Sequence, residues 1–351
     1  MQLDTTVSNI CFDDILLLPS RSNIKSRGQI VASTKLGNPK NPDGVIFMPN
    51  PFMTAPMEFI NSKKMVDQVT EYGGIAFIHR FSSREIRLDQ LQYHMQNGKY
   101  KDRIGFSISN IEAEDTEFIN KILKLGVKII LIDTAFGHTE IALNAVKKLR
   151  SICSPFVHIM TGNVSSFEAY RDLMEAGADS VRVGIGGGAA CTTRVVTGFG
   201  QPVLSSVIDI YERVKEDPFN GIISDGGIKN NGDAVKALAA GASAIMMGSF
   251  FSGHEECDGQ IDGKFIFRGL ASRGIQLENN SNPPNQDRLH IEGAEALIDN
   301  KGQVSSSIQQ LINNIKSGMS YCGAENLETL RKEARFIKVS PQSMLESGSR
   351  I

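Results

Sequence analysis

The sequence has few cysteines for its length, and their arrangement excludes a cross-linked fold. The five cysteines are Cys11, Cys153, Cys191, Cys257 and Cys322. They are odd in number, widely spaced and without a Cys-x-x-Cys pair, which argues against both a disulfide framework and a structural zinc site. We therefore expect a reduced, cytoplasmic protein.

Long apolar runs and an excess of charge of one sign are also lacking. No stretch approaches the roughly 18 uninterrupted apolar residues of a membrane-spanning helix, and residues 1–19 lack the basic-then-apolar pattern of a signal peptide. The formal net charge is -2, and no long basic run is present, so neither a membrane nor a nucleic acid is an expected partner. A hydrophobic content of 41% and a charged content of 22% are typical of a globular chain.

Eight short apolar segments recur along the chain, and many end in a small or polar residue. They span residues 52–55, 75–78, 104–108, 128–132, 156–160, 180–183, 221–223 and 244–247. Segments with helical spacing lie between most of them, at 118–125, 140–149, 166–174 and 232–238. Gly126, Gly177 and Gly241 stand where three of these helices should end in a left-handed glycine. Continuous apolar strands indicate burial on both faces, so the sequence predicts an α/β fold with a parallel sheet, a (β/α)₈ TIM barrel.

Two longer connections interrupt the repeat. Residues 184–200 follow the sixth strand, and about 253–302 follow the eighth. The second insertion contains the polar run 279–285 and is expected to be a mobile flap. In a barrel both insertions would lie at the catalytic, C-terminal face. The sequence outside the barrel repeat and its two insertions leaves no room for a second folded unit. Residues 1–351 are therefore expected to form one catalytic domain.

The first insertion carries the densest chemical signal, a glycine-rich run that leads to a cysteine. It reads Gly184-Ile185-Gly186-Gly187-Gly188-Ala189-Ala190-Cys191-Thr192-Thr193-Arg194. Such a run can turn sharply and expose backbone amides and carbonyls. Its spacing and its position after the sixth strand do not fit a dinucleotide-binding Rossmann motif. A lone Cys191 would be a buried, inert thiol; beside this loop, with Arg194 or backbone amides able to lower its pKa, it is a candidate nucleophile.

Two further turns predict a phosphate site. Ser224-Asp225-Gly226-Gly227-Ile228 follows the seventh strand, and Met247-Gly248-Ser249 follows the eighth. Barrels commonly bind phosphate in the loops after these two strands, and a carboxylate at a strand end, such as Asp225, can accept from ribose hydroxyls. The alternative is that these glycines serve turn geometry alone.

These segments resemble the inosine monophosphate dehydrogenase and guanosine monophosphate reductase family. The resemblance extends in the family's order from about residue 9 to 348. Besides the runs above, it rests on 12–19, Ala55-Pro56-Met57, Asp133-Thr134-Ala135 with Gly137-His138, Gly162-Asn163-Val164 and Tyr321-Cys322-Gly323-Ala324. The resemblance implies a homotetramer that acts on a purine nucleotide, GMP or IMP, with a nicotinamide cofactor.

The resemblance also implies roles for individual residues. Cys191 would attack purine C2, with Thr193 and Glu292 handling protons, although Glu292 alone could be a solvated surface acid. The implied substrate-binding residues are Met57, Gly188, Asp225, Gly227, Gly248, Ser249, Arg268, Gly269, Leu270 and Ser272. The implied cofactor-binding residues are Asp133, Thr134, Asn163, His79 and Arg80. The carbonyls of Gly186, Gly188 and Cys191 would hold a monovalent cation such as K⁺, completed by the tail Glu346-Ser347-Gly348 of a neighbouring subunit.

The family divides on the fate of the covalent intermediate. The resemblance implies that dehydrogenases pass hydride from IMP to NAD⁺ and hydrolyse the adduct with an Arg-Tyr pair on the flap. Reductases release ammonia from GMP and then take hydride from NADPH, using threonine and glutamate. No inserted pair of regulatory CBS domains interrupts the barrel, and Leu289 stands where the tyrosine beside Arg288 is expected. We therefore expect a GMP reductase.

Other features keep the alternatives open. Residues 317–323, the Glu346 tail and Arg80 are more typical of the dehydrogenases. A nucleotide-binding barrel without catalysis is the third hypothesis, which the retained Cys191 and Glu292 disfavour. The segment 254–257 contains His, Glu and Cys but lacks the spacing of a zinc site.

Several residues depart from both branches of the family. Gly187 and Ala189 replace a proline and a serine, and Phe267 stands where a phosphate-binding tyrosine is common. Losing the proline adds flexibility. Losing two hydroxyl donors indicates weaker phosphate binding or an altered substrate, such as a deoxynucleotide.

Overall fold

The predicted barrel is present, and its strands have the predicted order. The structure is a computed structural model that describes residues 9–269, 271–278 and 290–347. Eight parallel strands neighbour one another in the order β4-β11-β10-β9-β8-β7-β6-β5, and a parallel bridge between Met53 and Ile75 links the two end strands. The strands are β4 (Phe52–Thr54), β5 (Ala76–Ile78), β6 (Ile104–Ile108), β7 (Ile129–Ile132), β8 (His158–Val164), β9 (Ser180–Val183), β10 (Ile222–Asp225) and β11 (Ala244–Met247).

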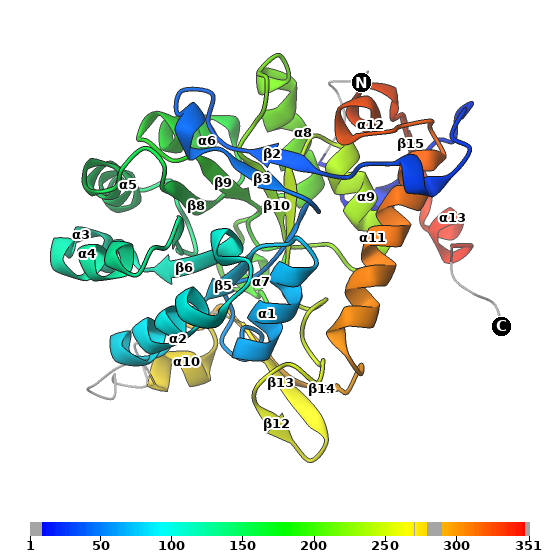
Figure 1. The fold of residues 1–351 in the computed structure, drawn as a ribbon. Helices are drawn as coiled ribbons and strands as arrows, with labels where there is room; N and C mark the ends of the chain where they lie inside the picture. Colours follow the sequence, from blue (N-terminus) through cyan, green and yellow to red (C-terminus); the bar gives the residue numbers. More distant parts are fainter. Residues whose placement is uncertain (1–8, 270, 279–289, 348–351) are drawn as a thin grey trace.

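Amphipathic helices surround these strands (Figure 1). They are α1 (Lys63–Glu71), α2 (Arg84–Asn97), α3 (Asn110–Glu114), α4 (Thr116–Lys124), α5 (Glu140–Ile152), α6 (Phe167–Glu175), α8 (Val203–Val214), α9 (Asn231–Ala239) and α11 (Val304–Ser320). The helix-ending glycines Gly126, Gly177 and Gly241 have φ of 90°, 110° and 116°, which confirms the predicted left-handed terminations. Burial of the strands on both faces explains their continuous apolar sequence.

The two insertions lie at the C-terminal ends of the strands, as expected. The first contains the short helix α7 (Thr193–Thr197). The second forms an antiparallel sheet of β12 (Gln260–Ile261), β13 (Lys264–Arg268) and β14 (Glu295–Asp299), with α10 (Arg273–Glu278) between β13 and β14. The described part of the flap is thus regular structure, held by strand pairing that its polar composition did not predict. The run 279–285, Arg288 and Leu289 lie outside the described residues.

The segments before and after the barrel pair with each other, and Phe12 packs against the turn after β10. Strand β1 (Ile15–Leu17) is antiparallel to β15 (Phe336–Lys338), and β2 (Thr34–Leu36) is antiparallel to β3 (Ile46–Met48). The remaining elements are α12 (Leu327–Glu333), α13 (Pro341–Leu345) and the 3₁₀ turns Phe12–Asp14, Arg27–Gln29, Pro42–Gly44 and Lys101–Arg103. The Phe12 ring lies against Gly227, where an added Cβ would be 3.3 Å from Phe12 Cε2.

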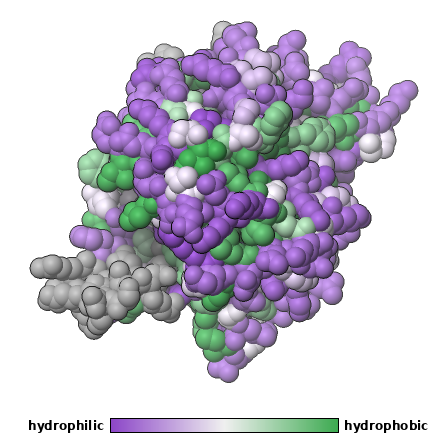
Figure 2. All heavy atoms as spheres, turned by 60° about the vertical axis from the view of Figure 1, so that its left-hand side comes forward, coloured by the Kyte–Doolittle hydropathy of each residue, from purple (hydrophilic) through white to green (hydrophobic). Residues whose placement is uncertain are grey.

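The face drawn in Figure 2 is mostly hydrophilic, with apolar side chains in patches between the hydrophilic ones. Ile111 in α3 and Ile141 in α5 are large apolar residues that are 81% and 69% exposed. Among the helices that the structure describes, none is both long and apolar enough to cross a membrane.

Candidate active site

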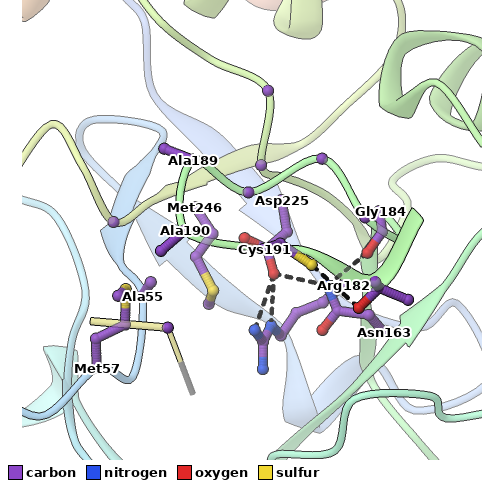
Figure 3. A pocket seen from close by; sticks show the side chains of 18 of the residues that line it. Ala55, Met57, Asn163, Arg182, Gly184, Ala189, Ala190, Cys191, Asp225 and Met246 are labelled. Carbon is purple, nitrogen blue, oxygen red and sulfur yellow. Dashed lines mark hydrogen bonds and ion pairs between the residues drawn. The ribbon is translucent and has the colours of Figure 1, made fainter. Parts of the chain in front are cut away.

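A cavity of about 480 Å³ opens at the C-terminal ends of the barrel strands. Its wall is built from residues that follow β4, β5, β7, β10 and β11, from the ends of β8 and β9, and from the two insertions. The lining residues include Ala55, Met57, Arg80, Asp133, Thr134, Asn163, Arg182, Gly186, Gly188, Cys191, Thr193, Asp225, Gly227, Lys229, Gly248, Ser249, Phe267, Gly269 and Glu292. Segments far apart in the sequence thus meet in one site, where Figure 3 shows ten of the lining residues with labels.

Most of the predicted site residues line this cavity, and three do not. Arg268 lies outside the wall because its guanidinium pairs with Glu58, at 3.0 Å from Nε to Oε2, and lies over the Phe59 ring. Ser272 is fully buried, and its hydroxyl finds no hydrogen-bond partner in the described part of the chain. His79 is the third, and Leu270 lies outside the described residues.

His79 is buried and does not line the cavity, although the next residue, Arg80, does. Its Nδ1 accepts a hydrogen bond from the Phe81 backbone N–H at 3.2 Å. Burial, with a smaller contribution from Arg87, lowers the pKa of His79 to about 4. The imidazole is therefore neutral at physiological pH and is a poor candidate for pairing with a cofactor phosphate.

Cys191 begins a hydrogen-bonded chain that ends on a carboxylate. Its thiol donates to Thr193 Oγ1 at 3.2 Å, and the Thr193 hydroxyl donates to Glu292 Oε2 at 2.7 Å. A nucleophile linked to a base through a third group is the arrangement that covalent catalysis requires. This chain can carry the thiol proton to Glu292 as the sulfur attacks, and can return a proton to a leaving group.

Backbone pairing brings Glu292 to the cysteine loop although 99 residues separate it from Thr193. The Thr192 N–H donates to the Glu292 carbonyl at 2.9 Å, and the Ala294 N–H donates to the Ala190 carbonyl at 2.8 Å. These bonds make an antiparallel bridge between Cys191 and the residue after Glu292. The end of the flap is thereby fixed as one wall of the site.

Arg194 does not take the role suggested for it beside the thiol. Its Nη2 donates to the Gln201 carbonyl at 2.6 Å and to the Ile185 carbonyl at 3.4 Å. The side chain passes so close to Gly186 and Gly200 that an added Cβ at either would collide with it. Arg194 therefore ties the two ends of the cysteine loop together.

The other cysteines are less suited to nucleophilic attack. All five are free, and burial raises the pKa of both Cys153 and Cys257 to about 11. Neither of those two lines the cavity, and both are thiols rather than thiolates at neutral pH. No cluster of three His, Cys, Asp or Glu side chains that could hold a metal ion occurs among the described residues, the 254–257 segment included.

A buried ion-pair chain forms the opposite wall. Arg182 on β9 places Nη1 2.5 Å from Asp133 Oδ1 and Nη2 2.9 Å from Asp225 Oδ2. Arg80 pairs with the other Asp133 oxygen at 3.0 Å. Asn163 Nδ2 donates to Asp225 Oδ2 at 2.8 Å, and Figure 3 shows Asn163, Arg182 and Asp225 together. Two cations thus balance two carboxylates, which is what buried charges need.

The neighbouring charges in this row of ion pairs favour the ionised forms of Asp133 and Arg182. Burial alone would raise the pKa of Asp133, but Arg182 and Arg80 hold it below its ordinary value. Burial alone would lower the pKa of Arg182, and Asp225 and Asp133 raise it instead. Asp133 is therefore a fixed acceptor rather than a proton donor near neutral pH.

Arg182 and Lys229 are cavity-lining residues that the sequence analysis missed. Arg182 is 4% exposed within the apolar run of β9, and a charge inside a strand buried on both faces is a signal that could have identified it. Lys229 follows the Gly226-Gly227 turn and pairs with Asp13.

The turns after β10 and β11 present backbone amides to the cavity. Gly226 and Gly227 have φ of 90° and 76°, a left-handed conformation that favours glycine. In the described part of the chain, no hydrogen bond is formed by the amides of Gly227, Gly248 and Ser249. Unpartnered amides in adjacent turns make a site for an anion.

Replacing Thr193 by valine is expected to break the hydrogen-bonded chain without changing its shape. We expect kcat to fall by about 10²- to 10⁴-fold, the usual contribution of general acid–base catalysis, with a much smaller change in KM for the nucleotide. The matched control is Thr193→Ser, which keeps the hydroxyl and should stay within about tenfold. Steady-state kinetics check this, and equal effects of both variants would contradict the relay.

Comparisons with known proteins identify the family. The family model described as "IMP dehydrogenase / GMP reductase domain" matches residues 9–350. An inosine-5'-monophosphate dehydrogenase of Borreliella burgdorferi is 29% identical over an alignment of 404 residues, gaps included. The alignment covers 97% of this chain and 96% of that protein. Another, of Chlorobaculum parvum, is 39% identical over 259 residues, 70% of this chain and 52% of that protein. The chain thus spans about half the length of the second relative.

A solved structure supports the fold independently. A GMP reductase from Trypanosoma brucei, crystallised with guanosine 5'-monophosphate, superposes with a TM-score of 0.86 at 22% identity, over 99% of this chain and 98% of that one. At that identity the likeness concerns the barrel. With a family model that covers nearly its whole length, the chain belongs to the IMP dehydrogenase / GMP reductase family of purine-nucleotide oxidoreductases.

Proposed function

We propose that this protein is a GMP reductase, which converts GMP to IMP and ammonia with NADPH as the reductant. The observation that carries the proposal is the hydrogen-bonded chain from Cys191 through Thr193 to Glu292. It can protonate a departing amine. Leu289, where the dehydrogenases' tyrosine is expected, supports the same choice from the sequence.

The chemistry balances with these groups. The Cys191 sulfur forms a bond to purine C2, and its proton passes through Thr193 to Glu292. The C2–N bond then breaks, and the amino group leaves as ammonia after it receives a proton from the same chain. Hydride addition at C2 expels the Cys191 sulfur and gives IMP, so the sum is GMP, NADPH and two protons to IMP, NADP⁺ and ammonium.

The substrate's ribose and phosphate fit the remaining wall. Asp225 Oδ2 is occupied by Arg182 and Asn163, which leaves Oδ1 to accept from a ribose hydroxyl. The amides of Gly227, Gly248 and Ser249 would receive the phosphate. Met57, Gly188 and Gly269 complete the enclosure, since all three line the cavity.

A nicotinamide cofactor fits the rim beside Asp133, Thr134 and Asn163. When bound, it supplies or accepts the hydride. Arg80 is 29% exposed and lines the cavity, so its guanidinium can meet a phosphate of the cofactor while Asp133 keeps Arg182 as its second partner. We place no cofactor contact on His79, because it is buried and neutral.

The alternative is IMP dehydrogenase, in which IMP, NAD⁺ and water give XMP and NADH. The names of the curated relatives favour it, since both of those described above are called inosine-5'-monophosphate dehydrogenase. It would use the same Cys191 adduct but would need an activated water to resolve it. A barrel that binds the nucleotide without chemistry is the third possibility.

One assay separates the three. Protein is incubated with GMP and NADPH, and separately with IMP and NAD⁺, while nicotinamide absorbance and ammonia are followed. We expect NADPH oxidation with one ammonia released per NADPH. NADH formation from IMP would show a dehydrogenase instead, and silence in both reactions would reject catalysis.

The proposal extends to a bound cation and to assembly. The carbonyls of Gly186, Gly188 and Cys191 are candidates for K⁺, although the Gly188 carbonyl already accepts the Cys191 N–H at 3.0 Å. A homotetramer would cover apolar side chains near the site, such as Val195 and Phe199, which are 89% and 77% exposed. We propose that residues 1–351 act together as one catalytic unit, with residues 253–302 as its flap.

A further inference from the structure

Two carboxylates of the candidate site come from different strands and share one arginine. Asp133 follows β7, Asp225 ends β10, and Arg182 lies on β9. In the strand order β10-β9-β8-β7, two strands separate the two aspartates. All three side chains are at most 12% exposed. Arg182 is therefore a buried link between two segments that lie far apart in the sequence.

This link uses most of the guanidinium. Arg182 Nη1 lies 2.5 Å from Asp133 Oδ1, and Nε and Nη2 lie 3.0 Å and 2.9 Å from Asp225 Oδ2; Figure 3 shows the contact with Asp225. Because the guanidinium is planar and its donors form a fixed fork, these contacts set the orientation of the two carboxylates relative to each other. A lysine could supply the same charge but could not hold both carboxylates in one plane.

The proposed ligands contact the two ends of this link. In the proposed function, Asp225 Oδ1 accepts from the ribose of the nucleotide, and the cofactor lies beside Asp133. The second oxygen of Asp133 has Arg80 at 3.0 Å, and Arg80 lines the cavity. A ligand at either end therefore meets a carboxylate whose position depends on Arg182.

Ordering one end of the link reduces the entropy lost in ordering the other. A ribose hydroxyl on Asp225 restricts that carboxylate, and the rigid plane of Arg182 passes the restriction to Asp133. A cofactor that then binds beside Asp133 loses less conformational entropy, which is positive coupling. Although burial raises it, Arg182 and Arg80 hold the pKa of Asp133 below its ordinary value, so this carboxylate stays ionised and bound to the fork.

We propose that Arg182 is a positioning residue that couples the two sites, so that the nucleotide and the cofactor each bind more tightly when the other is present. The inference rests on the proposed nucleotide and cofactor sites but not on the direction of the reaction. Coupling is reciprocal, so the factor by which GMP tightens NADP⁺ binding equals the factor by which NADP⁺ tightens GMP binding. A residue that only stabilised the fold would change each affinity and leave this coupling factor unchanged.

The coupling factor is measured by calorimetry with the Cys191→Ala protein, which cannot form the adduct. The dissociation constant of NADP⁺ is determined without GMP and with saturating GMP. We expect GMP to tighten NADP⁺ binding by at least about fivefold, and Arg182→Lys to reduce that factor by at least about threefold. Contact between the base and the nicotinamide contributes equally in both proteins, so it does not mask the change. A smaller factor in the parent protein, or a smaller reduction in the variant, would overturn the proposal.

Arg150→Lys is the matched control. Arg150 pairs with the buried Asp179 at 2.5 Å, and Asp179 directly precedes β9 and does not line the cavity. The variant thus removes the fork from a buried ion pair beside the same strand, and it should leave the coupling factor unchanged within about twofold. An equal loss of coupling in this control would show that any weakened ion pair near β9 has the same effect, and the role of Arg182 would be rejected.

Two further arms keep the test decisive. If Arg182→Lys does not fold, Arg182→Gln, which carries a neutral amide without the fork, is judged by the same criterion. If GMP and NADP⁺ do not bind but IMP and NAD⁺ do, the proposed reaction fails, and the same cycle with IMP and NAD⁺ decides the role of Arg182. Binding of neither pair would reject both proposals.

Discussion

Cys191→Ala is expected to reduce turnover by on the order of 10⁴-fold or more. The sulfur is the only atom of the relay that can form a bond to purine C2, so no neighbouring group can substitute for it. Binding should survive, because Asp225 and the amides of Gly227 and Gly248 are untouched. The measurement is the initial rate with GMP and NADPH, together with mass spectrometry of the protein and substrate to detect the covalent adduct.

The matched control for this prediction is Cys153→Ala. Cys153 is buried, its pKa is raised to about 11 by that burial, and it lies outside the cavity. Its replacement should lower stability slightly and leave turnover nearly unchanged. If Cys191→Ala kept more than a tenth of wild-type turnover, the covalent mechanism would be wrong.

The barrel could be predicted from the sequence because parallel strands are buried on both faces and therefore occur as short continuous apolar runs. The predicted bounds of β8 were less accurate: the strand was expected at residues 156–160 and is observed at His158–Val164. Phe156 is 66% exposed, in a turn that precedes the strand. The strand's extension includes a shift of register between Gly162 and Val164, which interrupts the pattern that periodicity detects.

The site was predictable where function depends on residue type and less so where it depends on side-chain direction. Cys191, Thr193 and Glu292 were expected to act together, and the structure joins them by hydrogen bonds. Arg268 and Ser272 are next in sequence to the cavity-lining Gly269 and Ala271, yet neither of the two lines the cavity. A residue's neighbours in sequence do not say which way its side chain faces, since that depends on packing partners from distant segments.

Arg182 was missed because it lies within the apolar run of β9, where no site residue was expected. Its substitution has the second largest expected effect of the changes considered. Arg182→Met would leave Asp133 with only Arg80 and Asp225 with only Asn163. Removal of one partner from a buried ion pair costs about 3 to 5 kcal/mol, and we expect the free energy of unfolding in urea to fall by that amount. Nucleotide binding should weaken as well, because the Asp225 carboxylate loses the group that orients it.

The pH dependence of this loss distinguishes the ion pairs from simple packing. Asp133 has its pKa lowered in the folded protein, so it contributes stability above the ordinary carboxyl pKa of about 4 and loses that contribution as the pH falls through its folded value. The difference between wild type and Arg182→Met should therefore be largest near neutral pH and shrink in acid. Arg182→Lys keeps the charge but not the forked geometry and should fall between the two. A difference that stayed constant with pH, or below about 1 kcal/mol, would mean that Arg182 contributes packing rather than charge.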